Sequence, residues 1–289
     1  MPALRLKEVR FKHEGSSGWA LDIDRLEVRQ GEFVTVLGRN GAGKTTLSLL
    51  ANGLVPRSVK GTFEGEVEVF GHRTSEHTVA QLSTVVGMVF QEPESQLFCM
   101  SVEEEVAFGP ENLAVPRAEI AERVGWALDL VGLKGLNDRS PFTLSGGQKQ
   151  RLAIAAALSM RPRMLVLDEP AYALDPVGRV ELYAMLDRLR SEHGMTVVVM
   201  ERDAEDLVEF SDRVVLLSQG SVVGSGTPAE TLSDVGKLGD LGISPPQLAE
   251  VAALLNARTR GRPFSFLTLD QAEAEINEGR RVGTGRGPA

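Results

Sequence analysis

The residues with the clearest chemistry stand in GRNGAGKT, residues 38–45, which matches the pattern G-x-x-x-x-G-K-[ST]. The apolar run FVTVL comes before it and the helix-like TTLSLLANGL follows, a context that favours a phosphate site over a chance match. Glycines let backbone N–H groups wrap phosphates at the start of a helix. The expected nucleotide contacts are Gly38, Arg39, Asn40, Gly41, Ala42, Gly43, Lys44, Thr45 and Thr46, with Lys44 on the β- and γ-phosphates and Thr45 on Mg²⁺.

A second stretch, RMLVLDE, supplies two carboxylates at the end of an apolar run. Asp168 could hold Mg²⁺ through water, and Glu169 could polarise a water that attacks a phosphate. Such a pair can also simply cap the following helix. Beside a phosphate loop, hydrolysis is the better interpretation.

The third stretch is TVVVMERDAED, residues 196–206, in which an apolar run ends directly in Glu201, Arg202 and Asp203. Ligands of open parallel sheets bind just beyond the carboxyl ends of the strands. Arg202 is therefore either a ligand contact or a solvated loop residue.

Five strand-like runs alternate with helical patterns, which predicts an α/β fold with a parallel sheet. A helical subdomain is expected at about 92–150, inserted into a first domain of residues 1–225. A small helical extension should cover 226–276, and 277–289 should form a disordered tail. The runs are FVTVLG (33–38), STVVGMVFQ (83–91), RMLVLDE (163–169), TVVVME (196–201) and DRVVLLSQG (212–220).

Composition narrows the class of protein. A formal net charge of −9 and a pI near 5.1 argue against nucleic acid as the main partner. The single Cys99 fits a reducing compartment. The sequence shows neither a signal peptide nor a run near the ~20 apolar residues that span a bilayer. We expect a cytoplasmic chain that can dock onto a membrane protein.

The motif LSGGQKQR, residues 144–151, lies just upstream of RMLVLDE. With this motif the chain resembles the ATP-binding subunits of ABC transporters. Ser145, Gly146, Gly147 and Gln148 begin a helix and form a second anion site, one that cannot face its own phosphate loop. The resemblance implies that this site closes on the ATP of a second ATPase subunit, so that two ATPs are held head to tail.

The resemblance also assigns roles to single residues. Gln91 matches the glutamine that touches Mg²⁺ and senses the transmembrane partner. Asp175 matches the aspartate of the loop after the Asp-Glu pair, although Ala171 and Tyr172 replace the usual Thr and Ser. His13 stands where an aromatic residue usually stacks on adenine, and its smaller ring implies a weaker base contact.

Residues 88–116, MVFQEPESQLFCMSVEEEVAFGPENLAVP, and the carboxyl-terminal GISPPQLAEVAALL are similar to energy-coupling factor (ECF) type importers of vitamins, cobalt or nickel. This implies a P-loop NTPase (RecA-like) α/β core with a small antiparallel sheet near the amino terminus. It also implies ATP and Mg²⁺ as ligands. The expected partners are a transmembrane coupling protein, a substrate-capturing membrane protein and a second ATPase, in a heterodimer or a homodimer, at the cytoplasmic face of the membrane. A conventional ABC transporter subunit and a soluble ABC regulator with little turnover are the alternatives.

One position departs from the family pattern. Counting back from SDRV, the histidine that contacts the γ-phosphate falls on Arg202. His193 comes before the strand and, at ~3.3 Å per residue, lies at its far end, so it cannot stand in. Arg202 either donates to the γ-phosphate, or marks a slowed site beside a more active partner, or points to solvent or pairs with Asp203 or Asp206. The slowed site predicts a gain of rate in Arg202→His.

Overall fold

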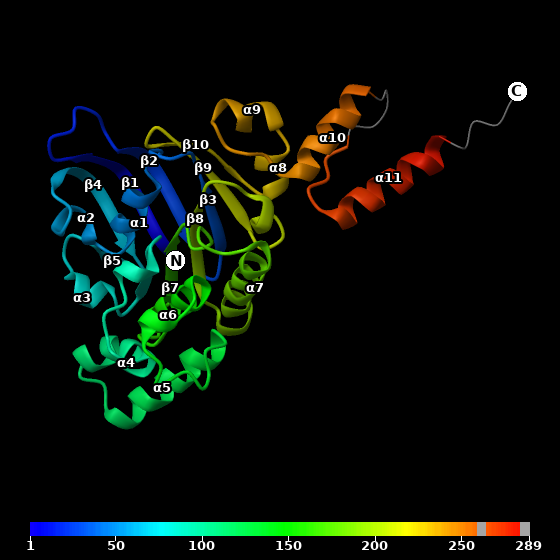
Figure 1. Ribbon diagram of the computed structural model, residues 1–289. Helices are drawn as coiled ribbons and strands as arrows, with labels where there is room; N and C mark the ends of the chain where they lie inside the picture. The colour runs from blue at the N-terminus through cyan, green and yellow to red at the C-terminus, as the bar shows by residue number, and fades with distance from the viewer. Residues whose placement is uncertain (259–263, 284–289) are drawn as a thin grey trace, which may run out of the picture.

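The computed structural model describes residues 1–258 and 264–283, with side chains as far as Glu278. Two sheets form the body (Figure 1). A four-stranded antiparallel sheet has the order β2-β1-β4-β5, and a six-stranded sheet has the order β10-β9-β3-β8-β7-β6. In the larger sheet only β10 runs antiparallel to its neighbour. This is the expected α/β core with a small antiparallel sheet near the amino terminus.

The strands are β1 (Pro2–His13), β2 (Leu21–Arg29), β3 (Phe33–Leu37), β4 (Gly61–Val69), β5 (His72–Arg73), β6 (Val86–Val89), β7 (Met164–Asp168), β8 (Thr196–Glu201), β9 (Arg213–Ser218) and β10 (Ser221–Gly226). The α-helices are α1 (Lys44–Ala51), α2 (Leu54–Arg57), α3 (Val79–Leu82), α4 (Val102–Asn112), α5 (Arg117–Leu130), α6 (Gly146–Leu158), α7 (Pro176–His193), α8 (Pro228–Leu232), α9 (Val235–Asp240), α10 (Gln247–Arg258) and α11 (Leu269–Gly283). Short 3₁₀ turns cover Pro93–Ser95, Pro141–Thr143 and Glu205–Leu207.

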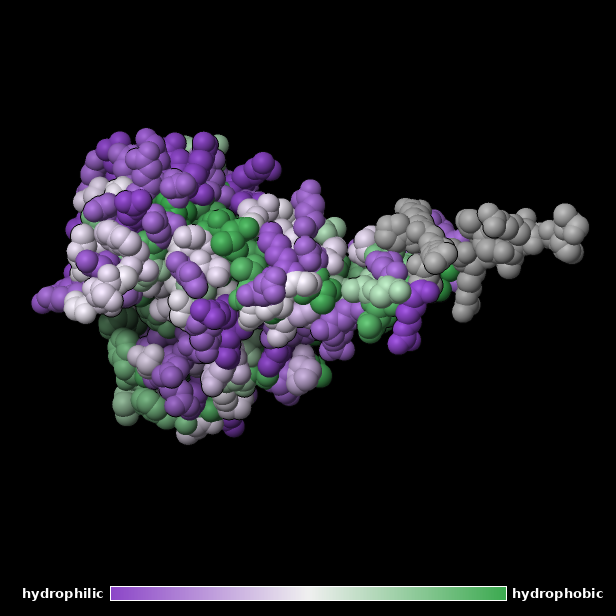
Figure 2. Space-filling model, turned by 90° about the horizontal axis from the view of Figure 1, so that it is seen from above, coloured by the Kyte–Doolittle hydropathy of each residue, from purple (hydrophilic) through white to green (hydrophobic). Residues whose placement is uncertain are grey.

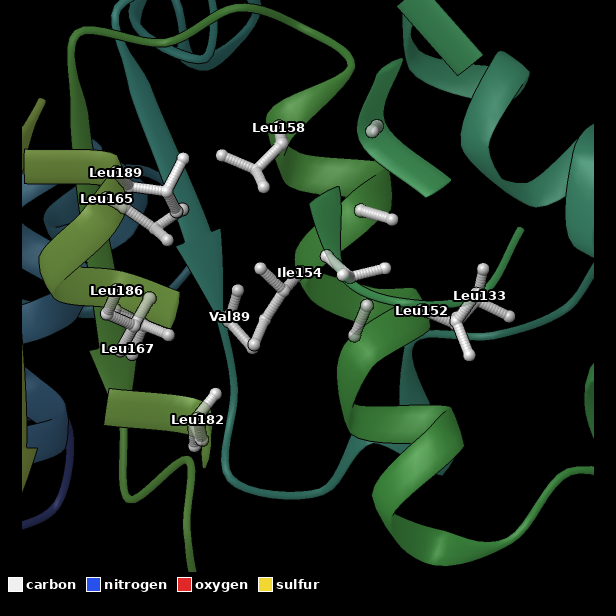
Figure 3. Packing of buried hydrophobic residues seen from close by; sticks show 14 of the residues in the cluster. Val89, Leu133, Leu152, Ile154, Leu158, Leu165, Leu167, Leu182, Leu186 and Leu189 are labelled. Carbon is white, nitrogen blue, oxygen red and sulfur yellow. The ribbon is translucent and has the colours of Figure 1, made fainter. Parts of the chain in front are cut away.

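Alternation along β8 divides the core into two layers. Val197 and Val199 face the cluster formed with α6 and α7, part of which Figure 3 shows. Val198 and Met200 face the opposite cluster, which contains α1 and the four-stranded sheet. Successive side chains of a strand point to opposite faces, so a strand apolar at every position is buried on both sides. The two layers fix β8, and its polar end, in the centre of the sheet.

The helical insert lies between β6 and β7 and contains α4, α5 and α6. Figure 1 shows α4 and α5 at the end of the molecule away from the carboxyl-terminal helices. The strand of the run STVVGMVFQ begins only at Val86, because Ser83 and Thr84 belong to a turn after α3. Helix α6 runs to Leu158, beyond the limit of 150 expected for the insert.

The carboxyl-terminal extension departs from expectation at its end. Helix α11 continues to Gly283, so the prediction of a disordered tail from 277 is wrong for its first part, and residues 284–289 lie outside the described residues. Glu278, Arg280 and Arg281 are good helix formers, and glycine is a common end point. Helices α10 and α11 project from the body (Figure 1), and hydrophobic surface is visible along this projection (Figure 2).

Candidate active site

The phosphate loop connects β3 to α1 and is shaped by two glycines. A Cβ built on Gly38 would lie 2.5 Å from the carbonyl oxygen of Leu217, and Gly43 has φ +106° with a Cβ position 2.7 Å from the carbonyl oxygen of Ala20. Neither position accepts a side chain without a shift of the backbone. The loop therefore presses against β9 and β2, and Lys44, the first residue of α1, is buried beneath it.

Glu169 is the centre of the site. Its Oε1 lies 3.2 Å from Nζ of Lys44, and its Oε2 lies 3.1 Å from Nε of Arg202. Gln91 donates from Nε2 to the same Oε2 at 3.1 Å. Glu169 also has φ +46°, a strained backbone for a residue with a side chain. Lys44, Gln91 and Arg202, which come from three separate stretches of the sequence, thus meet at the carboxylate of Glu169.

Asp168, beside it, is suited to hold a cation. It is 3% exposed, and its Oδ1 has no hydrogen-bond partner among the described residues. Burial raises the pKa of Asp168 and Glu169 adds to the rise, whereas a hydrogen bond from Thr45 and the charge of Lys44 oppose it. A buried carboxylate oxygen left free next to a hydroxyl fits Mg²⁺, which prefers oxygen ligands. Asp168, Thr45 and Gln91 would hold the ion, which would neutralise phosphate charge when bound.

A cavity of about 430 Å³ lies over the phosphate loop, and its lining joins the loop to the carboxylate of Glu169. His13 is at its edge, with Nε2 3.2 Å from Oγ1 of Thr46 and its ring edge-on to Phe11 at 4.8 Å. The histidine therefore borders the space that a nucleotide would fill. The lining residues are His13, Ala20, Asn40, Gly41, Gly43, Lys44, Thr45, Thr46, Gln91 and Glu169.

Arg202 lies in a neighbouring cavity of about 580 Å³, which shares Asn40 and Glu169 with the first. Its guanidinium carbon lies 5.4 Å from the ring centre of Tyr172, and 40% of the side chain is exposed. It pairs with Glu169, while Asp206 lies 3.8 Å from Arg179. The reading in which Arg202 pairs with Asp203 or Asp206 is thus replaced by a pair with Glu169. His193 ends α7 at the far end of β8, as expected, against Trp126.

Two residues of this region were not identified as site residues from the sequence. Glu201 is buried, and its Oε1 accepts hydrogen bonds from the hydroxyl of Tyr183 at 2.8 Å and from the N–H of Ala171 at 3.4 Å. Burial raises the pKa of Glu201 to about 7 and also raises the pKa of Tyr183. The sequence did contain a signal for Glu201, since an acid at the end of an apolar strand must be either solvated or paired. Tyr183, within a helix, gave no such signal.

We expect Glu201→Gln to flatten the dependence of stability on pH. The pKa of Glu201 rises from 4.5 to about 7 on folding. The folded carboxyl therefore keeps its proton above pH 4.5 while the unfolded one loses it, and wild type loses stability as pH rises through about 7. The expected difference between variants is about 1 kcal/mol, less than the full shift implies because buried sites relax. Urea unfolding at pH 5 and pH 8 measures it, with the exposed Glu209→Gln as the control. An equal pH dependence in wild type and Glu201→Gln would contradict it.

The second anion motif, residues 145–148, stands outside the lining of both cavities. Ser145 accepts a hydrogen bond from the N–H of Gln148 at 3.3 Å and caps α6, while Ser145 and Gly146 are exposed and line neither cavity. Gly147 packs near Leu174, where a Cβ would lie 3.2 Å from Cδ2. Asp175 caps α7 by accepting from the N–H of Gly178 at 2.7 Å. Within one chain, Ser145 and its neighbours therefore do not meet the phosphate loop.

Comparison with known proteins agrees with this geometry. The family model "ABC transporter" matches residues 21–172, more than half of the chain. A putative ABC transporter ATP-binding protein of Pyrococcus abyssi is 44% identical over 96% of this chain and 98% of its own length. The energy-coupling factor transporter ATP-binding protein EcfA1 of Symbiobacterium thermophilum is 46% identical, over 87% of this chain and 86% of its own.

Among solved structures, the cbiO1 protein of Clostridium perfringens, part of the ABC transporter complex cbiONQ, superposes with a TM-score of 0.74. The two are 31% identical, and the match covers 88% of this chain and 98% of that one. The chain is an ATPase that belongs to the ABC transporter ATP-binding protein family and resembles its energy-coupling factor members.

Proposed function

We propose that this chain binds and hydrolyses ATP to energise an ECF-type importer of a metal ion or a vitamin. It would sit at the cytoplasmic face of the membrane, on a transmembrane coupling protein that works with a substrate-capturing membrane protein. No helix in the described part of the chain is long and apolar enough to cross a membrane, so the transported ligand would pass through those partners.

Docking onto the transmembrane coupling protein is supported by an apolar groove formed partly by the segment that follows Gln91. A cavity of about 270 Å³ is lined by Gln96, Leu97, Phe98, Phe108 and Met160, among others. Phe98 and Phe108 pack edge to face at 4.7 Å while remaining 58% and 44% exposed, and Met100 beside them is 78% exposed. Clustered exposed aromatic and Met side chains favour a protein interface. Gln91, five residues before Gln96 in the chain, donates to Glu169 and so links the segment that carries this surface to the active site.

The catalytic residues are expected to exchange contacts when ATP binds. Lys44 now has three acceptors, the carbonyls of Gly38 at 2.7 Å and Arg39 at 3.4 Å and the carboxylate of Glu169 at 3.2 Å. Phosphates entering the loop would attract the Lys44 ammonium more strongly than any of these, since they carry more charge. Glu169 would then lose one cation and become free to accept a proton from the attacking water.

The second ATPase would complete the site. Because Ser145 and Gly146 are exposed and line neither cavity, they are available to close on the ATP of a second subunit. We favour a heterodimer in which this subunit turns over slowly. The permanent cation of Arg202, paired with Glu169, supports this proposal because it opposes protonation of the carboxylate that must act as a base. A homodimer stays possible, and the expected effect of Arg202→His on turnover separates the two.

Docking predicts a specific defect. Phe98→Ser, co-expressed with the transmembrane coupling protein of the same organism, should retain about threefold less of that protein during purification in detergent, because an aromatic anchor is lost. Val223→Ser, an exposed apolar position on β10, is the matched control.

Equal retention by the two variants would contradict docking in the groove. ATP binding with little turnover by a wild-type chain that retains no coupling protein would favour a soluble ABC regulator instead.

A further inference from the structure

The carboxyl-terminal extension touches the segment that carries Arg202. Asp203 and Ser244 form an isolated parallel β-bridge. The residue after Ser244 is Pro245, which has no N–H to give to such pairing. The bridge therefore depends on the main chain of Ser244 itself, and it is placed one residue beyond Arg202.

A second contact follows two residues later. The N–H of Gln247, the first residue of α10, donates to Oε2 of Glu205 at 2.8 Å. Glu205 thus satisfies one of the free donors at the start of that helix. The extension therefore contacts both ends of the short segment from Asp203 to Glu205, through Ser244 at one end and Gln247 at the other.

Apolar packing lies beneath these polar contacts. Ala204 is 1% exposed and Ile243 is 2% exposed, and both belong to one cluster with Leu37, the last residue of β3. This cluster joins the extension to the strand that leads into the phosphate loop. Its other buried members are Val214, Leu216, Leu232, Leu238, Ala249 and Leu267.

The extension also forms one wall of the cavity that contains Arg202. Gly242 and Ser244 line it together with Glu169 and Tyr172. A Cβ built on Gly242 would lie 3.5 Å from Cδ of Arg39, and both residues line this cavity, so the extension lies close to the phosphate loop as well. Residues more than 200 positions apart in the chain therefore share one wall of the active site.

We propose that the carboxyl-terminal extension is a positioning element for hydrolysis: Ser244 and the start of α10 hold residues 203–205 so that Arg202 stays against Glu169. Loosening the extension would then weaken the contact between Arg202 and Glu169, and so have part of the effect of removing Arg202. This rests on the proposed influence of Arg202 on turnover, but the positioning itself can be measured without it.

Hydrogen exchange tests the positioning. Ser244→Pro removes the main-chain N–H, whereas the matched Ser244→Ala keeps it. In the full-length chain, Ser244→Pro should speed amide exchange across residues 202–207 by about fivefold, because local opening becomes easier, and Ser244→Ala should not. Glu205→Ala against Glu205→Gln, which keeps an acceptor for Gln247, repeats the comparison if the proline variant does not fold. Unchanged exchange in Ser244→Pro and Glu205→Ala overturns the proposal.

Turnover tests the route through Arg202. Ser244→Pro should shift phosphate release about threefold in the same direction as Arg202→Ala, and should add no further shift in the Arg202→Ala background, since coupled residues are non-additive. Equal shifts in both backgrounds would mean general loosening, and would overturn positioning through Arg202. If Arg202→Ala leaves turnover unchanged, the slowed-site proposal fails, and the exchange result alone decides the positioning role.

Discussion

Replacing Glu169 with glutamine is expected to lower steady-state phosphate release from Mg-ATP by about 10²–10⁴-fold, the usual contribution of a general base. Glutamine keeps the shape of the side chain and one acceptor oxygen, which can serve Lys44 or Gln91, but it cannot take a proton from water. ATP affinity should stay within about threefold of wild type, because the groups expected to contact the phosphates are those of the loop at 38–45. The change therefore separates binding from chemistry.

The measurement pairs phosphate release with equilibrium binding of ATP. Glu111→Gln makes the same chemical change at an exposed position of α4 and should turn over like wild type. A Glu169→Gln variant that binds ATP and still releases phosphate within tenfold of wild type would show that another group is the base. A variant that no longer binds ATP would show that the three contacts of Glu169 hold the loop itself.

Consecutive motifs made most of the site predictable. The phosphate loop, Asp168 and Glu169 are local patterns, and the parallel sheet brings the ends of β3, β7 and β8 to one edge. That rule was enough to expect Lys44, Glu169 and Arg202 near one another. The structure adds what spacing does not specify, namely that three side chains converge on one carboxylate and that Glu169 adopts a positive φ.

Contacts between distant segments could not be predicted from the sequence. The bridge between Asp203 and Ser244 joins a loop to a Pro-Pro stretch that the sequence marks only as the entry of a helix. Helices α8 and α9 are each only one or two turns long, too short for a periodic signal. Tyr183 lies on a helix whose apolar face fits many partners, so its bond to Glu201 needed three-dimensional placement.

Replacing Arg202 with histidine should raise turnover about fivefold at pH 8. The ion pair between Arg202 and Glu169 has one buried and one 40% exposed partner, so its worth is about 1 kcal/mol, near the top of the range for exposed pairs. Removing it makes Glu169 a better base by that amount, which is about fivefold in rate. A neutral imidazole can still donate one hydrogen bond to a phosphate.

The pH dependence of this gain identifies its cause. A histidine titrates near pH 6.5, and below that pH the imidazolium restores a cation beside Glu169. The gain over wild type should therefore be full at pH 8 and shrink towards pH 6, while Arg202→Lys, which keeps the charge, should show no gain at either. Gain in Arg202→His alone, with this profile, means that Arg202 restrains the base and that a faster second ATPase accounts for transport. Unchanged or lower turnover would mean that Arg202 is itself a working γ-phosphate contact, so that two copies of this chain suffice.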